Sequence, residues 1–425
     1  MVGSRSDKEG SIKKTGLYYG WIMLAACFVI GITVWGTRFS FGVFFNALQD
    51  DFGWTRAMTS GIFSVYMTLC AAVPILNGWL SDKYGPKLVI CLAGFFTGLS
   101  LFLTSRATVL WQFYLTYSLL LALGTGGVYV VMMSTISRWF TTKRGLVIGI
   151  AGAGGGVGTL IMTPVAAQLI SSYGWQTSAM IMGITAWVFI ISGGLLLRRA
   201  PAEVSNETKT LPAKANETAK KVQSSRTHPG TSFRSSIRTS DFWLVWLSWF
   251  LYAVCSYLVT THVVPFGRDS GMSALSAATL LSLVGGISVI GRVMMGRAGD
   301  TMGLKRTLLI GAFVQMAAML LLAYAAAIWM LFLAAVVYGF VRGGVDACLG
   351  AFVPERFGLL NIGAIMGGLS IGYDFGATLG PILGGFIFDA TNSYKVAFLI
   401  AGAASLVMAA AIGLLETRQP KSQRS

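Results

Sequence analysis

"GWLSDKYGPK" (78–87) and "GRAGDTMGLKR" (296–306) lie far apart in this chain but share one pattern. Each reads Gly, three residues, Asp, two residues, Gly, one residue and Lys, directly after a long apolar run. Two other stretches, 163–182 and 380–400, also resemble each other. Their prolines are separated by almost the same length of chain as the aspartates of the first pair. Two similar offsets from unrelated motifs predict that the chain is a duplicated unit.

The composition is that of a membrane protein. Of the 425 residues, 55% are hydrophobic and only 11% are charged, whereas a soluble protein has about a quarter of its residues charged. Apolar runs such as 18–46, 87–105, 175–197 and 307–333 are long enough to cross about 30 Å of hydrocarbon as helices. All five cysteines fall inside predicted helices and are interpreted as packing residues. We therefore expect an all-α protein in a lipid bilayer, with no metal and no cofactor.

We predict twelve transmembrane helices in two halves of six. Their approximate ranges are 18–46, 54–80, 87–105, 108–136, 145–172, 175–197, 241–266, 273–296, 307–326, 328–353, 360–388 and 393–415. The remaining segments differ from these in composition. We expect a cytoplasmic tail at 1–17, a six-helix bundle at 18–199, a polar cytoplasmic linker at 200–240, a second bundle at 241–416 and a tail at 417–425.

The net charge of +16 is distributed unevenly. With the N-terminus inside, the cytoplasmic segments contain 25 of the 32 Lys and Arg residues. The outer loops contain only Arg56, Arg106, Arg268 and Lys395. An excess of basic residues is typical of cytoplasmic loops, so we expect both termini in the cytoplasm. Because the basic charge sets the orientation, no nucleic-acid partner is expected.

The duplicated loops have residues suited to holding two helices together. Glycine allows close approach of helix ends, Asp can cap a helix, and Lys can bond exposed carbonyl groups. A single copy is explained by a tight turn, but two copies favour a conformational latch. The predicted latch residues are Gly78, Asp82, Gly85, Lys87, Gly296, Asp300, Gly303 and Lys305.

Arg292 lies inside a very apolar predicted helix, eight residues before Asp300. About 12 Å of helix therefore separates it from the cytoplasmic end. A guanidinium keeps its charge and offers a fork of donors that matches a carboxylate. We predict that Arg292 binds a substrate carboxylate. The alternative is a structural salt bridge, but the position one turn earlier is Ser288, which has no charge.

Four other charged residues, Arg38, Arg342, Asp346 and Asp374, lie within predicted helices and should face the bundle interior or a water-filled cavity. Arg342 is four residues before Asp346, so we expect the two side chains to pair on one helix face, with a role in gating or coupling as the alternative. Asp374 lies among glycines with no base near it in sequence. We interpret Asp374 as a proton-responsive group; the alternative is a structural Asp bonded to backbone or Arg.

Five more side chains are candidates for the same site. Arg38, near the outer end of the first helix, either steers anions or anchors at the lipid headgroups. His262 either titrates near neutral pH or is a structural hydrogen-bonding group. Tyr129, Tyr338 and Tyr373 either offer hydroxyl groups to a substrate or only pack.

Several motifs carry a family resemblance. The duplicated loop resembles that of the major facilitator superfamily, and the resemblance covers the whole chain. The stretch "RWFTTKRGLVIGIAGAGGGVG" (138–158) resembles the helix 5 signature of the monocarboxylate transporter family, and "YYGW" (18–21) is similar to the opening of its helix 1. Oxalate/formate antiporters share much of the helix 5 pattern. We expect a prokaryotic member of the monocarboxylate transporter family, with two pseudo-symmetric halves of six helices.

The resemblance also bears on individual residues. Animal members usually carry the helix 8 Arg together with an Asp four residues earlier that serves proton coupling. Arg292 matches the Arg, but Ser288 replaces the Asp. The proton carrier must then lie elsewhere, with Asp374 as the first candidate and Asp346 as another. In the oxalate/formate antiporters a helix 11 Lys complements the Arg, and here Leu369 occupies that position, which favours a substrate with one carboxylate.

Together these features predict proton-coupled symport of a small monocarboxylate, such as lactate or pyruvate, across the cell membrane. The partners are then the monocarboxylate, the proton and the bilayer. Two alternatives remain, an organic-anion exchanger of the oxalate/formate type and a carboxylate sensor that does not transport. An enzyme is not expected, because the sequence has no Ser/His/acid set and no cluster with metal-ligand spacing.

Overall fold

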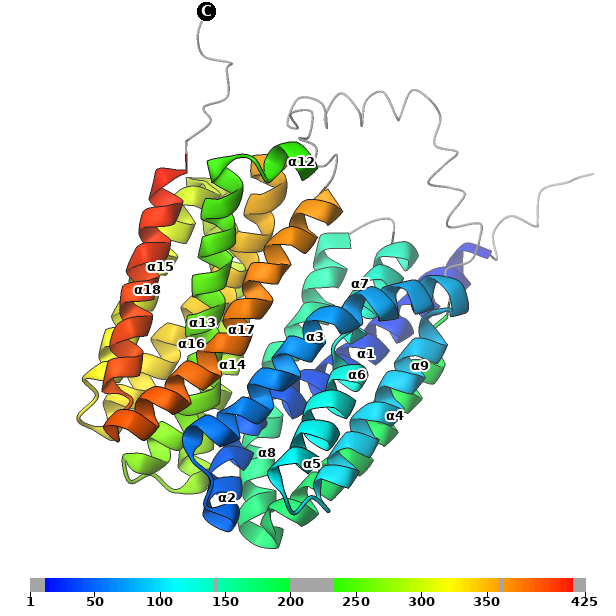
Figure 1. Ribbon diagram of the computed structural model, residues 1–425. Coiled ribbons are helices and arrows are strands. Elements are labelled where there is room, and N and C mark those ends of the chain that lie inside the picture. Colours follow the sequence, from blue (N-terminus) through cyan, green and yellow to red (C-terminus); the bar gives the residue numbers. More distant parts are fainter. Residues whose placement is uncertain (1–11, 141–143, 199–232, 359–361, 416–425) are drawn as a thin grey trace, which may run out of the picture.

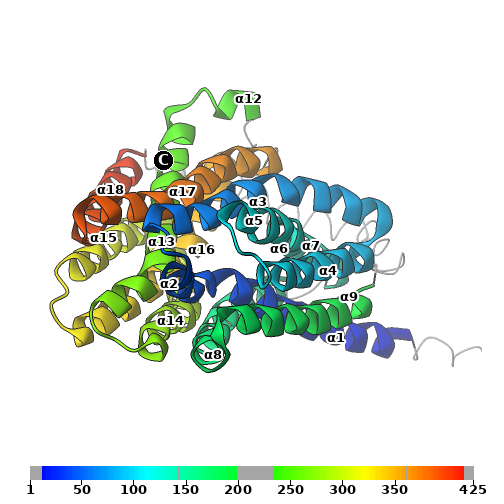
Figure 2. The same cartoon turned by 60° about the horizontal axis from the view of Figure 1, so that its bottom comes forward.

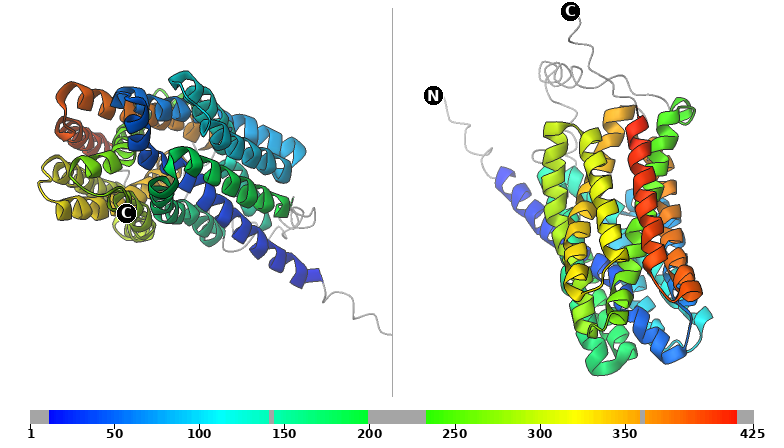
Figure 3. Two further views of the ribbon diagram at one scale, coloured as in Figure 1. Left: turned by 90° about the horizontal axis from the view of Figure 1, so that it is seen from below. Right: turned by 90° about the vertical axis from the view of Figure 1, so that its left-hand side faces the viewer.

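The computed structural model describes residues 12–140, 144–198, 233–358 and 362–415, and all regular elements in these ranges are helices. Figure 1 shows two bundles side by side, one made of α1 to α9 and the other of α12 to α18. In the right-hand view of Figure 3 the start of α1 and the end of α18 lie toward the same side of the molecule. We call the opposite side the outer end, because the charge distribution predicts that it faces away from the cytoplasm.

The first bundle contains six spans. Its elements are α1 (Ile12–Phe39), α2 (Phe41–Phe52), α3 (Arg56–Tyr84), α4 (Pro86–Thr104), α5 (Leu110–Phe113), the π-helical segment η1 (Tyr114–Leu120), α6 (Leu121–Thr125), α7 (Val128–Trp139), α8 (Arg144–Ala186), the π-helical segment η2 (Trp187–Ile191) and α9 (Ser192–Leu196). The first span runs through α1 and α2, and the fourth runs from α5 to α7.

The second bundle has longer uninterrupted helices. Its elements are α12 (Phe233–Ser236), α13 (Ser240–Asp269), α14 (Ala274–Met302), α15 (Leu304–Ala323), α16 (Ile328–Phe357), α17 (Ile362–Thr391) and α18 (Lys395–Leu414). The six helices α13 to α18 are all long and apolar enough to cross a membrane. Most of the predicted linker, part of the predicted N-terminal tail and all of the predicted C-terminal tail lie outside the described residues.

The long helix α8 contains two spans that run in opposite directions. Gly174 interrupts it with a φ of 77°, a left-handed conformation that glycine adopts readily. Next to this break, Trp175 donates a hydrogen bond to Asp51 at the outer end. At the other end of the second span, the carbonyl of Leu196 accepts a hydrogen bond from Tyr19 near the start of α1. The chain therefore reverses at Gly174, and the prediction of twelve spans is confirmed.

The backbone turns repeat along with the sequence motifs. Positive φ angles occur in three matching pairs, Gly53 with Gly271, Gly85 with Gly303, and Gly174 with Asn392. The two members of each pair are separated by the same length of chain, which is also the separation of the two loop aspartates. The turns at Gly85 and Gly303 lie inside the duplicated loops and join α3 to α4 and α14 to α15. The duplication is thus present in the backbone geometry as well as in the residue pattern.

The two bundles meet through a few helices. Helix α3 packs against α17, α8 against α14, and α2 against α13. Figure 2 looks further onto the outer end and shows α2 beside α13. In Figure 1 the bundles lie together at this end and diverge toward the side of the chain termini.

Within the second bundle, glycines bring α14 and α16 into backbone contact. A Cβ atom added at Gly343 would lie 1.8 Å from the carbonyl oxygen of Ser288, and one added at Gly291 would lie 1.8 Å from that of Phe340. Small residues of this kind allow close helix packing in membranes. The contact brings Arg292, next to Gly291, within reach of α16.

Replacing Gly343 should separate these helices. Gly343→Ala forces the new methyl group against the Ser288 carbonyl, and such overpacking costs about 1–3 kcal/mol. We expect a lower midpoint of thermal unfolding in detergent. Gly350→Ala is the matched control on the same helix, because no atom lies within 4 Å of its added Cβ. Equal unfolding midpoints for the two variants would contradict this packing.

Candidate functional site

Arg292 forms an ion pair with an acid on a neighbouring helix. Its NH2 group donates to the Oδ2 atom of Asp346 on α16 at 2.8 Å. Both side chains are 39% exposed, so this pair is open to its surroundings although it lies at membrane depth. The guanidinium also touches the first bundle, since NH1 is 3.4 Å from where a Cβ of Gly152 on α8 would be. The pair therefore lies where the two bundles meet.

The expected pairing of Arg342 with Asp346 on one face of α16 is wrong, because the Asp346 carboxylate bonds Arg292 instead. The physical reason is the glycine contact between α14 and α16, which brings another cation within range. Arg342 turns toward the first bundle, where its guanidinium carbon is 4.9 Å from the centre of the Phe39 ring.

Tyr129 reaches the Arg292–Asp346 pair from the other bundle. It lies on α7, is 42% exposed and is within electrostatic range of both charged groups. Its ring packs edge-on against Trp35 at 5.5 Å, which fixes its orientation. Of the predicted tyrosines, it is the one that faces Arg292 across the interface.

Arg38 lies much deeper than predicted. The first span continues through α2 to Phe52, so Arg38 is 14 residues from its outer end, about 21 Å of helix. Anchoring at the lipid headgroups is therefore wrong. Its NH2 group donates to the Tyr257 hydroxyl at 2.9 Å, across the interface. Asp374 is a carboxylate within electrostatic range of it.

Tyr338 and Tyr373 are packed beside Arg342. Tyr373 contacts the rings of Trp249, Tyr252 and Tyr257. Tyr338 is fully buried beside Ser256, so its hydroxyl is not open to a ligand in this structure.

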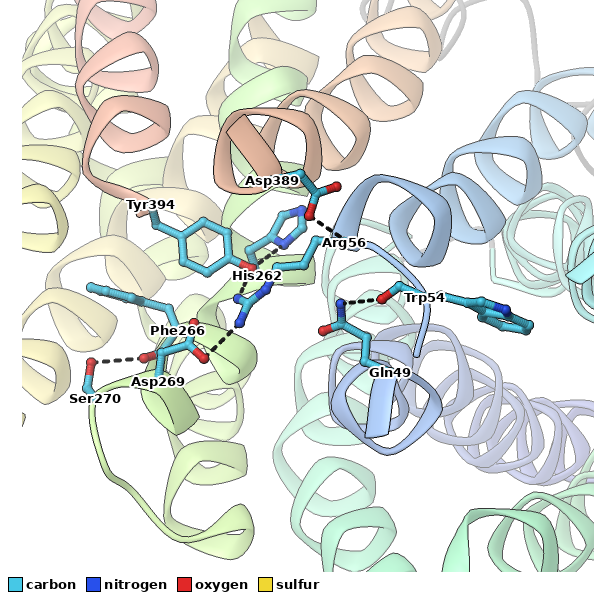
Figure 4. A network of polar contacts seen from close by, with 9 residues as sticks. All are labelled: Gln49, Trp54, Arg56, His262, Phe266, Asp269, Ser270, Asp389 and Tyr394. Atoms are coloured by element: carbon cyan, nitrogen blue, oxygen red, sulfur yellow. Dashed lines mark hydrogen bonds and ion pairs between the residues drawn. The ribbon is translucent and has the colours of Figure 1, made fainter. Parts of the chain in front are cut away.

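A second polar network closes the outer end, as Figure 4 shows. Arg56 on α3 donates to Asp269 on α13 at 2.7 Å and to the Tyr394 hydroxyl, and it stacks on the ring of Phe388 at 3.6 Å. The Asp389 carboxylate on α17 accepts the backbone N–H groups of Arg56 at 2.9 Å and Ala57 at 2.7 Å. An acid of one bundle thus caps the first turn of a helix of the other, which suits the helix dipole.

His262 belongs to this outer network and not to the centre. Its Nε2 atom lies 2.8 Å from the Pro381 carbonyl, which can only accept, so Nε2 carries the proton. In the neutral ring Nδ1 then accepts from the Tyr394 hydroxyl at 3.0 Å. Burial raises the pKa of Tyr394, which keeps that hydroxyl protonated. Because both ring nitrogens form hydrogen bonds within the protein, His262 is a structural residue of the outer network and is not part of the proposed substrate site.

The predicted latch residues lie at the ends of α3, α4, α14 and α15. Lys305 donates to the carbonyl oxygens of Gly413 at 2.9 Å and of Leu415, at the end of α18. This contact lies within one bundle, and the side chain of Asp82 lies outside the described residues. The latch therefore stays a prediction.

Comparison with known proteins now identifies the family. The model of the Major Facilitator Superfamily matches residues 24–324 and 288–425. The chain belongs to this superfamily. It is 27% identical to "Monocarboxylate transporter 13" of Rattus norvegicus over 387 residues, 91% of this chain and 86% of that protein. It is 24% identical to "Monocarboxylate transporter 12" of Homo sapiens over 427 residues, 95% of this chain and 82% of that protein.

Solved structures agree on the fold. A nucleoside transporter has a TM-score of 0.75 at 13% identity and covers 93% of this chain and 99% of its own. A D-xylose–proton symporter has a TM-score of 0.74 at 15% identity, and the match covers 93% of this chain and 97% of the symporter chain. As a superfamily member the chain is a transporter and not an enzyme. The relatives named above are vertebrate proteins, so the expectation of a prokaryotic member has no support.

The outer network was not expected from the sequence. Arg56 is predicted to be a cation of an outer loop, whereas its side chain is only 11% exposed. Asp389 and Tyr394 come from the end of α17 and the start of α18, far away along the chain. The one local signal was the position of Arg56 at the first turn of a helix, where a cation is unfavourable unless an acid is near.

Breaking the network should open the outer end. Ser60 is fully buried between α3 and α17, since a Cβ at Gly385 would lie 2.6 Å from its Oγ atom. In a Ser60→Cys background, Arg56→Ala should raise the rate of labelling by an external thiol reagent at least about tenfold, because an ion pair and its stacking are lost. Arg106→Ala is the control, since Arg106 is exposed in another outer loop. An unchanged rate would show that Arg56 does not hold this end closed.

Proposed function

We propose that this protein is a secondary active transporter of the monocarboxylate transporter family, moving a small monocarboxylate such as lactate or pyruvate with a proton across the cell membrane. The proposal rests on one observation above all, the exposed Arg292–Asp346 ion pair between the two bundles. The names of the relatives support the substrate class. Alternating access between two rocking halves is a known transporter mechanism.

Arg292 is the proposed receptor for the substrate carboxylate. Its fork of donors fits a carboxylate bidentately, and Asp346 accepts a hydrogen bond from its NH2 nitrogen. Because both side chains are 39% exposed, the pair can open without leaving a charge buried and alone. Tyr129 can then donate its hydroxyl to the bound anion from the other bundle.

Asp346 is the proposed proton carrier. The substrate and Asp346 compete for the same guanidinium, and a proton on Asp346 removes one competitor. Each carboxylate that binds Arg292 is thereby linked to one proton, and the charge of the site is the same when empty and when loaded. This arrangement supplies from α16 the acid that is missing at Ser288 on α14. Asp374, near Arg38, is the second candidate.

Arg292→Lys should lower lactate uptake at least about 100-fold, because an ammonium group cannot bind a carboxylate bidentately. Uptake of labelled L-lactate into proteoliposomes with an acidic outside measures this effect. Arg297→Lys is a control on the same helix, nearer the cytoplasmic end and exposed. Uptake near that of the wild type in Arg292→Lys would refute the proposed role of this residue.

Asp346→Asn should separate transport from the proton. An amide cannot carry a proton and does not compete strongly for Arg292, so lactate should still bind. We expect exchange of labelled for unlabelled lactate to persist, while uptake driven by a pH gradient falls at least about tenfold. If the pH-driven uptake stays intact, the carrier is another group, and Asp374→Asn becomes the next variant to measure.

An organic-anion exchanger is the second candidate, favoured by the absence of an acid at Ser288, whose hydroxyl bonds the Gly285 carbonyl at 2.6 Å. In that case the wild type exchanges anions but shows no net uptake along a pH gradient. Binding without either activity would instead indicate a sensor.

A further inference from the structure

Arg342 is a half-buried cation without an acid partner among the described residues. It lies on α16, 14 residues from the outer end of that helix, about 21 Å along its axis. Its surroundings are Tyr252, Tyr257, Tyr338 and Tyr373. The sequence predicts that Arg342 pairs with Asp346, but Asp346 pairs with Arg292. A guanidinium held at membrane depth in this way needs an anion or a function.

Arg38 of the other bundle lies at the same depth and faces the same aromatic group. Its guanidinium carbon is 5.8 Å from the centre of the Phe39 ring, and that of Arg342 is 4.9 Å from the same point. The separation of the two carbons therefore cannot exceed the sum of these distances. Tyr257 is close to both, since its hydroxyl accepts from Arg38 and its ring is within electrostatic range of Arg342.

The charges around these two arginines do not balance. In the part of the chain that the structure describes, the titratable groups that face them are tyrosines, Cys70 and one carboxylate, Asp374. Two guanidinium groups and one carboxylate leave one positive charge at the interface. Donor capacity is also left over, because the Nε atom of Arg38 has no partner among the described residues. The unmatched charge and this donor together suit one bound anion.

We propose that Arg342 is a substrate-contacting residue that forms, with Arg38, a clamp for the substrate carboxylate between the two bundles. A carboxylate can accept from two guanidinium groups at once, with about 4 Å between its carbon and each guanidinium carbon. Two such contacts stay below the upper limit that the two ring distances set for the separation of the guanidinium carbons. Without an anion the like charges repel each other, and with one they attract it from both sides, which draws the bundles together.

The clamp rests on the proposed function and adds a second step to it. Arg342 is one helical turn, about 6 Å, further from the cytoplasmic end than Asp346. The carboxylate first meets the exposed Arg292 and then moves one turn deeper to the clamp. Since Arg292 and Asp346 are both on the second bundle, this deeper position is the one where an arginine of each bundle holds the substrate.

The test compares Arg342→Gln, Arg342→Lys and the control Arg106→Gln in proteoliposomes and in detergent. We expect Arg342→Gln to raise the KM for L-lactate at least about 30-fold and Arg342→Lys to raise it less, since lysine keeps the charge but loses the fork. Arg106→Gln should leave KM unchanged. In detergent, lactate or succinate should raise the unfolding midpoint of the wild type and of Arg106→Gln but not of Arg342→Gln.

The outcomes separate the two proposals. If the wild type takes up lactate with a proton and Arg342→Gln has the same KM, the clamp is overturned and the proposed function stands. If the wild type does not take up lactate, but carboxylates stabilise it and fail to stabilise Arg342→Gln, the clamp stands and the lactate proposal fails. Should Arg342→Gln not fold, Arg342→Lys decides, and an unchanged KM in that variant overturns the clamp.

Discussion

An arginine at membrane depth cannot lose its charge, and the centre of this protein is organised by that constraint. Arg292 is compensated by Asp346 on a neighbouring helix. Arg38 is surrounded by tyrosine rings, bonds one hydroxyl and one thioether, and has a carboxylate in range. Arg342 has rings on its faces and no acid partner among the described residues. The surroundings of the three arginines differ in how much of the positive charge they compensate. The uncompensated positive charge is what we propose attracts an anion to the interface.

The outer network follows a different principle. Its hydrogen bonds form a chain in which each group donates to the next: Arg56 donates to Tyr394, Tyr394 donates to His262, and His262 donates to the Pro381 carbonyl. Its one cation, Arg56, is paired with Asp269 and lies beside a second carboxylate, Asp389, so no further anion is needed there. The contrast explains why two arginines at bundle contacts, Arg56 and Arg342, have different proposed roles. Arg56 is proposed to hold the outer end closed, and Arg342 is proposed to bind an anion in the interior.

The sequence was sufficient for the fold because repeated loops and apolar runs are local patterns. It also predicted that Arg292 would be at the interface, since a charge in such a helix has few other places to go. Asp346 could not be identified from the sequence as the partner of Arg292, because the spacing along α16 favours Arg342. The deciding contact is between a glycine of each helix and the backbone of the other helix. The depth of Arg38 was also missed. The predicted first helix ended at residue 46, whereas the span continues to Phe52, so Arg38 lies further from the outer end than expected.

The left-handed turns set the dimensions of the two halves. The spacing of the turns along the chain is the same in both halves. The turns are at Gly53, Gly85 and Gly174 in the first half and at Gly271, Gly303 and Asn392 in the second. The helices of the two halves therefore have matching lengths. In the rocking motion proposed above, halves of matching length pivot at a common depth. Arg38 and Arg342, each 14 residues from an outer end, are the residues that we propose hold the substrate at that depth while the openings on the two sides alternate.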